Sequence, residues 1–320
     1  MSIHPVILLI LGFTALIKGG DWLVDGSVSI AKKFSIPSLV IGLTIVSFGT
    51  STPELFVSVF ASLNGSPDLA IGNVLGSNTA NILLILGIAA CIYPLRIRQN
   101  TIWKETPFSI LAILLVAFLA SDTILDRAQI DILNRVDGII LLMFFAVFLY
   151  YIFTISKHKH EEECTDYAEM GTGKSALIIL AGLAGLTLGG RWIVDAGISI
   201  ASLFGLSEAV IGLTIVAIGT SLPELAASAV AAYKRHADIA VGNVIGSNIF
   251  NTLWILGLSS TIKPLPIEKS MQFDIAIVIG ATLLFLSFIY IGEKKVITRW
   301  QGASFVGFYI AYIVFLFYRG

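Results

Sequence analysis

The sequence contains ten separate apolar runs, most of them about as long as the ~20 residues that an α-helix needs to cross a bilayer. Lipid offers no water to unpaired backbone groups, so a chain that enters it must form helices or a closed barrel. Hydrophobic residues make up 56% of the chain and charged residues 13%, whereas soluble domains are about a quarter charged. We therefore predict an all-α membrane protein with ten transmembrane helices, at about residues 5–30, 36–63, 69–92, 103–120, 135–155, 174–201, 207–233, 239–262, 271–290 and 300–318.

The chain is also an internal duplication. IGLTIVSFGTSTPE at 41–54 and IGLTIVAIGTSLPE at 211–224 agree at eleven of fourteen positions under a shift of 170 residues. The same shift aligns IGNVLGSNTAN at 71–81 with VGNVIGSNIFN at 241–251. Each half holds five predicted spans, an odd number, so the second half should be inverted in the membrane relative to the first.

The charges of the loops agree with this inversion. Lys32 and Lys33 match neutral Ser202 and Leu203, while the loop from 62 to 68, which has no Lys or Arg, matches one that contains Lys234 and Arg235. Cytoplasmic loops are enriched in Lys and Arg, and this rule places both termini outside. We expect the protein in the plasma (cell) membrane. We expect a first repeat at 1–155, a short cytoplasmic linker at 156–173 and a second, inverted repeat at 174–320.

Glu54 and Glu224 are predicted near the middle of spans two and seven. An acidic side chain at that depth costs about 2.5–3.5 kcal/mol on insertion scales, so something must compensate. Pairing with a base or protonation would do so, but no Lys or Arg is expected at the same depth near either residue. A bound cation is the interpretation that the sequence favours.

Prolines stand directly before both glutamates. Pro53 and Pro223 lack an N–H and crowd the carbonyl four residues earlier, so helices 2 and 7 should be broken there. Irregular backbone at membrane depth is tolerated only where it faces protein or a watery cavity. Hydroxyl groups three or four residues from each glutamate should share its helix face; they belong to Thr50, Ser51, Thr220 and Ser221.

Spans three and eight supply a second set of polar side chains, spaced four residues apart: Ser77 and Asn81, and Ser247 and Asn251. We expect Gly72, Gly76, Gly242 and Gly246 to allow close helix packing. We expect Asn73, Asn78, Asn243 and Asn248 mainly to satisfy backbone groups or line the pathway. Asp68 and Asp238 are interpreted as N-caps of spans three and eight.

The predicted ligands are all hard oxygens, which suit calcium, magnesium or sodium rather than zinc or copper. Magnesium sheds its water reluctantly, whereas calcium accepts six to eight flexible oxygen ligands, and two carboxylates would neutralise one calcium ion. Sodium likes the same ligands, so exchange is physically plausible. We expect Ca²⁺ and Na⁺ as transported ions, the lipid bilayer as surroundings and no other cofactor. A net charge of −1 argues against a nucleic-acid partner, and no protein partner is evident.

With these motifs in place, the chain resembles the cation/calcium exchanger superfamily, in its prokaryotic sodium/calcium exchanger branch. The resemblance rests on GTSTPE with GNVLGSN and GTSLPE with GNVIGSN. It implies a ten-helix fold of inverted repeats whose first and sixth helices slide past the others, and exchange of three sodium ions for one calcium ion. It also implies the ligands, which are Glu54, Glu224, Thr50, Ser51, Thr220, Ser221, Ser77, Ser247, Asn81, Asn251 and the carbonyl groups of Ser47 and Ala217. Where some relatives have Asp, position 251 is Asn, leaving two acids in the site.

Other functions remain open at this point. Paired glutamates could carry protons in a proton/calcium exchanger, although that branch usually has a different motif at the acid. A potassium-dependent exchanger is also possible. A calcium-permeable channel would use a ring of carboxylates, but broken helices in inverted repeats favour a transporter. An enzyme is the weakest alternative, because no catalytic constellation is recognisable among the spans.

Overall fold

The computed structural model describes residues 5–97, 99, 101–125, 129–156, 170–203, 217–291 and 295–319. Seven of its helices are long and apolar enough to cross a membrane, and a bent pair over Ser38–Asn64 makes an eighth candidate span. The predicted count of ten is not confirmed. Residues 207–216 of the predicted seventh span lie outside the described residues, and the last helix, Arg299–Arg319, is not among the candidates. The fold class is confirmed, since almost every described element is a helix.

The described part of the first half contains helices interrupted by short π-helical segments (η) and two strands. In chain order these are α1 (Pro5–Phe34), α2 (Ser38–Ile41), η1 (Gly42–Val46), α3 (Ser47–Thr50), α4 (Thr52–Asn64), α5 (Pro67–Ala80), η2 (Asn81–Ile85), α6 (Leu86–Ile92), β1 (Leu95–Arg96), η3 (Thr101–Glu105), α7 (Thr106–Leu119), α8 (Asp122–Leu125), β2 (Asp131–Leu133) and α9 (Arg135–Ser156).

The second half repeats this order where it is described. Its elements are α10 (Thr172–Leu203), α12 (Ala217–Thr220), α13 (Leu222–Tyr233), α14 (Ala237–Ile249), η5 (Phe250–Ile255), α15 (Leu256–Ile262), β3 (Leu265–Ile267), α16 (Lys269–Tyr290), β4 (Val296–Ile297) and α17 (Arg299–Arg319). Most of the predicted linker at 156–173 lies outside the described residues.

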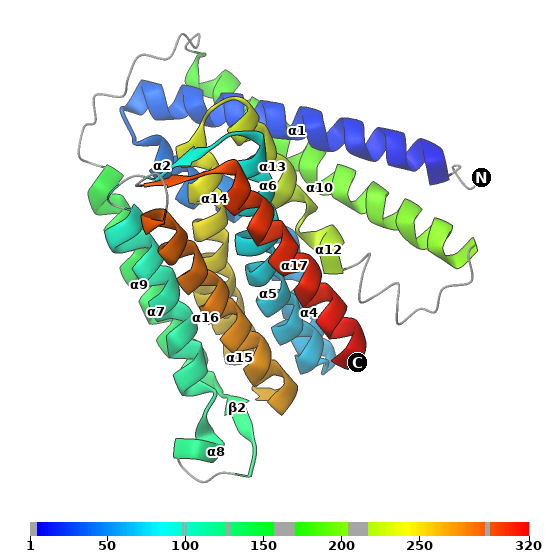
Figure 1. Ribbon diagram of the computed structural model, residues 1–320, viewed down its shortest axis with the longest axis vertical. Coiled ribbons are helices and arrows are strands. Elements are labelled where there is room, and N and C mark those ends of the chain that lie inside the picture. Colours follow the sequence, from blue (N-terminus) through cyan, green and yellow to red (C-terminus); the bar gives the residue numbers. More distant parts are fainter. Residues whose placement is uncertain are drawn as a thin grey trace.

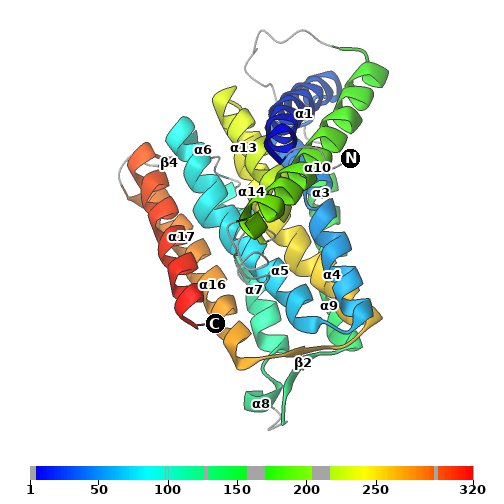
Figure 2. The ribbon, with the colours of Figure 1, turned by 90° about the vertical axis from the view of Figure 1, so that its right-hand side faces the viewer.

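Two short antiparallel ribbons, which the sequence did not predict, tie the connections together. β1 pairs with β4, joining Leu95 to Ile297, and β2 pairs with β3, joining Leu133 to Leu265. Leu95 and Leu265 are matching positions of the two halves, yet their ribbons lie at opposite ends of the bundle (Figure 2). Matching connections at opposite ends are what an inverted repeat requires.

α1 and α10 lie side by side and cross the remaining helices at a steep angle (Figure 1). Glycines let their backbones touch: a Cβ atom on Gly19 would lie 2.8 Å from the carbonyl oxygen of Gly182, and one on Gly189 would lie 2.7 Å from that of Gly12. Any side chain at these positions would push the helices apart. The two helices therefore pack as one unit against the rest of the molecule.

The predicted packing role of the four motif glycines holds in one half only. A Cβ on Gly242 would lie 2.8 Å from the carbonyl oxygen of Leu39, and one on Gly246 would lie 2.7 Å from the Ser47 hydroxyl. Gly72 and Gly76 have no such neighbour within 4 Å among the residues described here. For this second pair, the interpretation as packing residues was wrong in this conformation.

One interpretation of two charged residues also needs correction. Asp68 and Asp238 are not N-caps; they lie in the first turns of α5 and α14, after the caps Ser66 and His236. A carboxylate in a first turn still interacts favourably with the helix dipole.

Asp21 and Arg191, which match each other in the repeat, do not pair. Asp21 lies 3.1 Å from Lys234, which also contacts Asp25 at 2.8 Å. Arg191 lies 3.9 Å from Asp195, four residues along α10, and both of these side chains are largely exposed.

Candidate functional site

The breaks predicted in helices 2 and 7 place both glutamates at the start of a new helix. α3 ends at Thr50, Ser51 leaves the helical conformation (φ −81°, ψ 6°), and α4 begins at a bend of 47°. Ser221 interrupts the second half in the same way (φ −86°, ψ 2°). Glu54 and Glu224 fall in the first turns of α4 and α13, where the unpaired N–H groups and the helix dipole favour an anion. Each break is local, because proline tolerates the first turn of a helix but not its interior.

Both glutamates are buried, with 0% of either residue exposed, and they lie close enough to repel each other. The Ser51 hydroxyl of the first half donates a hydrogen bond of 3.0 Å to Oε1 of Glu224 in the second. Conversely, Thr220 interacts with the Glu54 carboxylate, although neither Glu54 oxygen accepts a hydrogen bond of normal geometry. The two breaks thus face each other, and each supplies polar groups to the other half's carboxylate.

Two of the ligands predicted on spans three and eight, Ser77 and Asn251, lie beside these breaks. The Ser221 hydroxyl donates to that of Ser77 at 3.4 Å, and Nδ2 of Asn251 donates to the same Ser77 oxygen at 3.1 Å. Asn81 and Ser247 are also buried. Side chains from the predicted spans two, three, seven and eight therefore form a polar cluster inside an apolar protein.

Several oxygens of this cluster have no hydrogen-bond donor. Among the described residues, they are Oε1 and Oε2 of Glu54, Oε2 of Glu224, Oδ1 of Asn81, Oδ1 of Asn251 and Oγ of Ser247. Buried polar atoms are nearly always paired, and leaving a buried charge uncompensated costs several kcal/mol. No Lys or Arg in the described ranges forms an ion pair with either glutamate. The unpaired atoms are the hard oxygens that a calcium or sodium ion would bind.

The two predicted carbonyl ligands, Ser47 and Ala217, differ from the side-chain ligands. The Ser47 carbonyl accepts hydrogen bonds from the Ser51 backbone N–H at 2.9 Å and from the Thr50 hydroxyl at 3.4 Å, so it would share its lone pairs with an ion. The structure describes only the backbone of Ala217, at the start of α12.

Four buried or half-buried groups support the glutamates from behind. Nδ2 of Asn73 donates to the Glu54 carbonyl at 3.3 Å and to Ser58 at 3.0 Å. Nδ2 of Asn243 does the same with Glu224, at 3.4 Å, and with Ser228, at 2.9 Å. Satisfying backbone groups is the role expected of these two asparagines. Ser58 and Ser228 were missed, although their matching positions in the repeat could have revealed them.

Asn243 has one further role, because its Oδ1 accepts a hydrogen bond of 3.1 Å from the Thr50 hydroxyl. This contact ties the end of α3 to α14 of the other half.

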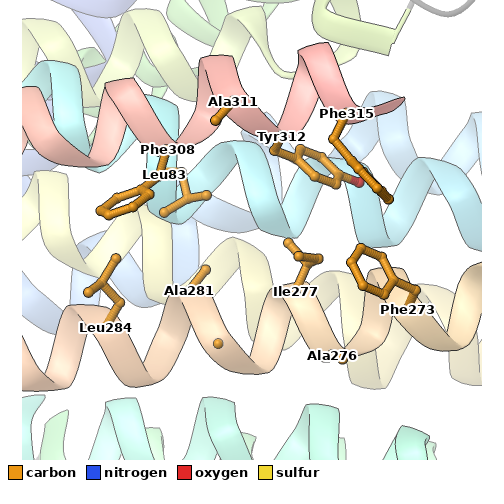
Figure 3. Close-up of a pocket in the computed structure, with 11 residues that line it drawn as sticks. Leu83, Phe273, Ala276, Ile277, Ala281, Leu284, Phe308, Ala311, Tyr312 and Phe315 are labelled. Carbon is orange, nitrogen blue, oxygen red and sulfur yellow. The ribbon is translucent and has the colours of Figure 1, made fainter. Parts of the chain in front are cut away.

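A pocket of about 370 Å³ between α16 and α17 is separate from this cluster. Its lining is apolar apart from Tyr312 (Figure 3), whose hydroxyl is hydrogen-bonded to Asp274. It offers no set of oxygen ligands, so it is not the ion site.

Comparisons with known proteins agree with this geometry. The family model for sodium/calcium exchanger proteins matches residues 4–154 and 174–318. The chain is 39% identical to the putative antiporter CaxA of Alkalimonas amylolytica, over 97% of this chain and 98% of that protein. It is 34% identical to the sodium/calcium exchanger MaX1 of Methanosarcina acetivorans, over 98% of each.

Among solved structures, the sodium-calcium exchanger NCX_Mj soaked with Na⁺ and Sr²⁺ superposes with a TM-score of 0.82. Its sequence is 34% identical, and the match covers 98% of this chain and 99% of that one. An inverted pair of broken helices, two buried carboxylates and a match over nearly the whole length all lead to one assignment: this multi-pass membrane protein belongs to the sodium/calcium exchanger family.

Proposed function

We propose that this chain is a secondary active antiporter that exchanges several sodium ions for one calcium ion by alternating access. The observation that carries the proposal is the set of buried oxygens without donors, which includes both oxygens of Glu54 and one of Glu224. Two carboxylates balance one Ca²⁺, and the neutral hydroxyl and amide oxygens complete its coordination. Transport, rather than catalysis, is the activity of the family to which the chain belongs.

The proposed cycle uses the same site for both ions. One calcium ion leaves the two carboxylates neutralised, whereas three sodium ions, the number that the family resemblance implies, would leave a charge of +1. Exchange with that stoichiometry moves net charge and would respond to membrane potential. We propose that α1 and α10 move together, because their glycine-mediated contact makes them one packing unit.

We further propose that the protein lies in the cell membrane with both termini outside. The basic loops that we assign to the cytoplasm include Lys32, Lys33, Lys234 and Arg235, and the positive-inside rule supports this orientation. A reporter enzyme that works on only one side of the membrane, fused to the C-terminus, tests the assignment: activity confined to the cytoplasm would reverse it.

Radiolabelled calcium uptake into proteoliposomes tests the coupling ion. Vesicles loaded with sodium and diluted into sodium-free buffer should accumulate calcium, while matched proton or potassium gradients alone should not. Uptake driven by protons but not by sodium would replace the proposal with a proton/calcium exchanger. A strict need for potassium would indicate a potassium-dependent exchanger, and calcium flux without any countergradient would indicate a channel.

A further inference from the structure

Two asparagines behind the ion site, Asn78 and Asn248, contact the two asparagines whose oxygens face it. Nδ2 of Asn251 donates to Oδ1 of Asn78 at 3.1 Å, and Nδ2 of Asn81 donates to Oδ1 of Asn248 at 2.9 Å. Each contact crosses between the halves, and Asn78 and Asn248 are matching positions of the repeat. Both residues are buried, with 0% and 3% exposed.

These contacts decide which end of each ligand amide faces the cation. An asparagine side chain has a donor end and an acceptor end of nearly the same shape. Because the Nδ2 groups of Asn81 and Asn251 are engaged, their Oδ1 atoms remain, buried and without a donor. A rotation by 180° would turn an NH₂ group toward the cation and bring two amide oxygens together, which is unfavourable on both sides.

The far ends of Asn78 and Asn248 also have partners. Nδ2 of Asn78 donates to the Thr252 hydroxyl at 2.8 Å, which leaves its Oδ1 toward Asn251. Asn248 is held by a bond of 3.3 Å from its Nδ2 to the Asn78 carbonyl. The direction of donation therefore runs outward from the ion site through the asparagine pair to a hydroxyl and a main-chain carbonyl.

We propose that Asn78 and Asn248 are positioning residues that hold the amides of Asn251 and Asn81 with their oxygens toward a hard cation. The inference rests on the proposed function of the site as a calcium and sodium site. Neither residue touches the ion; each acts through a ligand of the opposite half. This explains why amides can serve at positions 81 and 251, where a carboxylate would present oxygen in either orientation.

That difference between amide and carboxylate gives a test. In wild type, Asn78→Ala leaves Nδ2 of Asn251 with only the Ser77 hydroxyl, which can accept or donate and therefore does not select one orientation of the amide. Calcium binding measured calorimetrically on purified protein should then weaken about 10-fold or more, as is typical when the partner of a metal ligand is removed. In the Asn251→Asp background both terminal atoms are oxygens, and Asn78→Ala should then weaken calcium binding about 3-fold or less. The reciprocal pair, Asn248→Ala with and without Asn81→Asp, should show the same coupling.

Asn73→Ala is the matched control, because Asn73 supports the Glu54 main chain and does not contact Asn251. Its effect should be equal in both backgrounds. All variants are first compared with wild type by size-exclusion chromatography. An equal loss for Asn78→Ala in the two backgrounds would show a merely structural role and overturn the inference. The readout is equilibrium calcium binding, so it does not depend on which ion drives transport. Sodium-driven uptake could be absent while Asn78→Ala still has different effects in the two backgrounds, and uptake could be present while the two effects are equal.

Discussion

Lys234, which follows α13, contacts two aspartates of α1, whereas the matching residues of α10 contact each other. Lys234 is 17% exposed and contacts Asp21 and Asp25. Their counterparts in the repeat, Arg191 and Asp195, are exposed and contact each other. The two halves are nearly identical in sequence around the ion site but differ where the α1 and α10 unit meets the rest of the bundle.

The motif glycines show the same asymmetry, since Gly242 packs against span two and Gly72 has no counterpart contact among the described atoms. An inverted repeat that transports must adopt two conformations related by exchange of the roles of its halves. In the proposed cycle the structure is one of these two conformations, and the contacts found in only one half are those that we expect to differ in the other.

The largest effect is expected at the carboxylates. Glu54→Gln and Glu224→Gln should each lower sodium-driven calcium uptake about 100-fold or more, because a neutral amide removes half of the charge that balances Ca²⁺. Glu54 should be the more sensitive, since neither of its oxygens accepts a hydrogen bond of normal geometry from a described residue. Glu268→Gln, at the exposed cap of α16, is the control. Near-normal transport by either site variant would remove that glutamate from the site.

Alanine substitutions at matching glycines should change the stability of the protein by different amounts in the two halves. Gly242→Ala would force a methyl group to within 2.8 Å of the Leu39 carbonyl oxygen, and overpacking of this kind costs about 1–3 kcal/mol. Gly72→Ala meets no described atom and should be neutral. The thermal unfolding midpoint of each detergent-purified variant measures the difference. Equal midpoints would mean that the packing asymmetry does not exist in solution.

Substitutions of the two serines at the breaks, Ser51 and Ser221, should also differ in their effect on calcium affinity. Ser51→Ala removes a hydrogen bond to the charged Glu224, a class of bond worth about 1.5–3 kcal/mol, and should raise the half-saturating calcium concentration about 10-fold. Ser221 donates only a long hydrogen bond to Ser77, so Ser221→Ala should change the half-saturating calcium concentration by less than about 3-fold. The concentration dependence of uptake in proteoliposomes measures both, and the reverse order would contradict the assignment of partners.

The smallest effect is expected at the ion pairs. Burial lowers the pKa of Lys234, but its hydrogen bonds and charge attraction to Asp25 and Asp21 outweigh this and leave the pKa raised. The lysine therefore keeps its charge at neutral pH, and the contribution of its pairs is lost only as pH rises above the ordinary lysine pKa.

Lys234→Gln should destabilise this conformation by about 1 kcal/mol, shifting a two-state population about 5-fold. Spin-label distances between α1 and α13 would report the shift. Arg191→Gln, in an exposed pair, should shift nothing, and exposed Lys174→Gln is a further control. If Arg191→Gln shifted the population as much as Lys234→Gln, the proposed difference between the two ion-pair regions would be wrong.

Most of the ion site could be predicted from the sequence because its determinants are local or repeated. Proline at 53 and 223 breaks a helix wherever the helix lies, and a carboxylate in an apolar run needs compensation whatever surrounds it. The duplication then confirmed each feature by showing it twice. Hydrogen bonds join Ser51 to Glu224 and Ser77 to both Ser221 and Asn251; that these groups bind an ion stays a prediction.

Partners across the two halves could not be predicted, because a shift of 170 residues relates equivalent positions and does not say which residues touch. Only the tertiary structure decided that Lys234 meets Asp21 and Asp25, that Asn78 orients Asn251 and that β1 pairs with β4. It also decided which half packs tightly. The sequence determined which groups are available for a cation, since that follows from residue type and spacing; their orientation depends on contacts between segments far apart in the chain, which spacing does not encode.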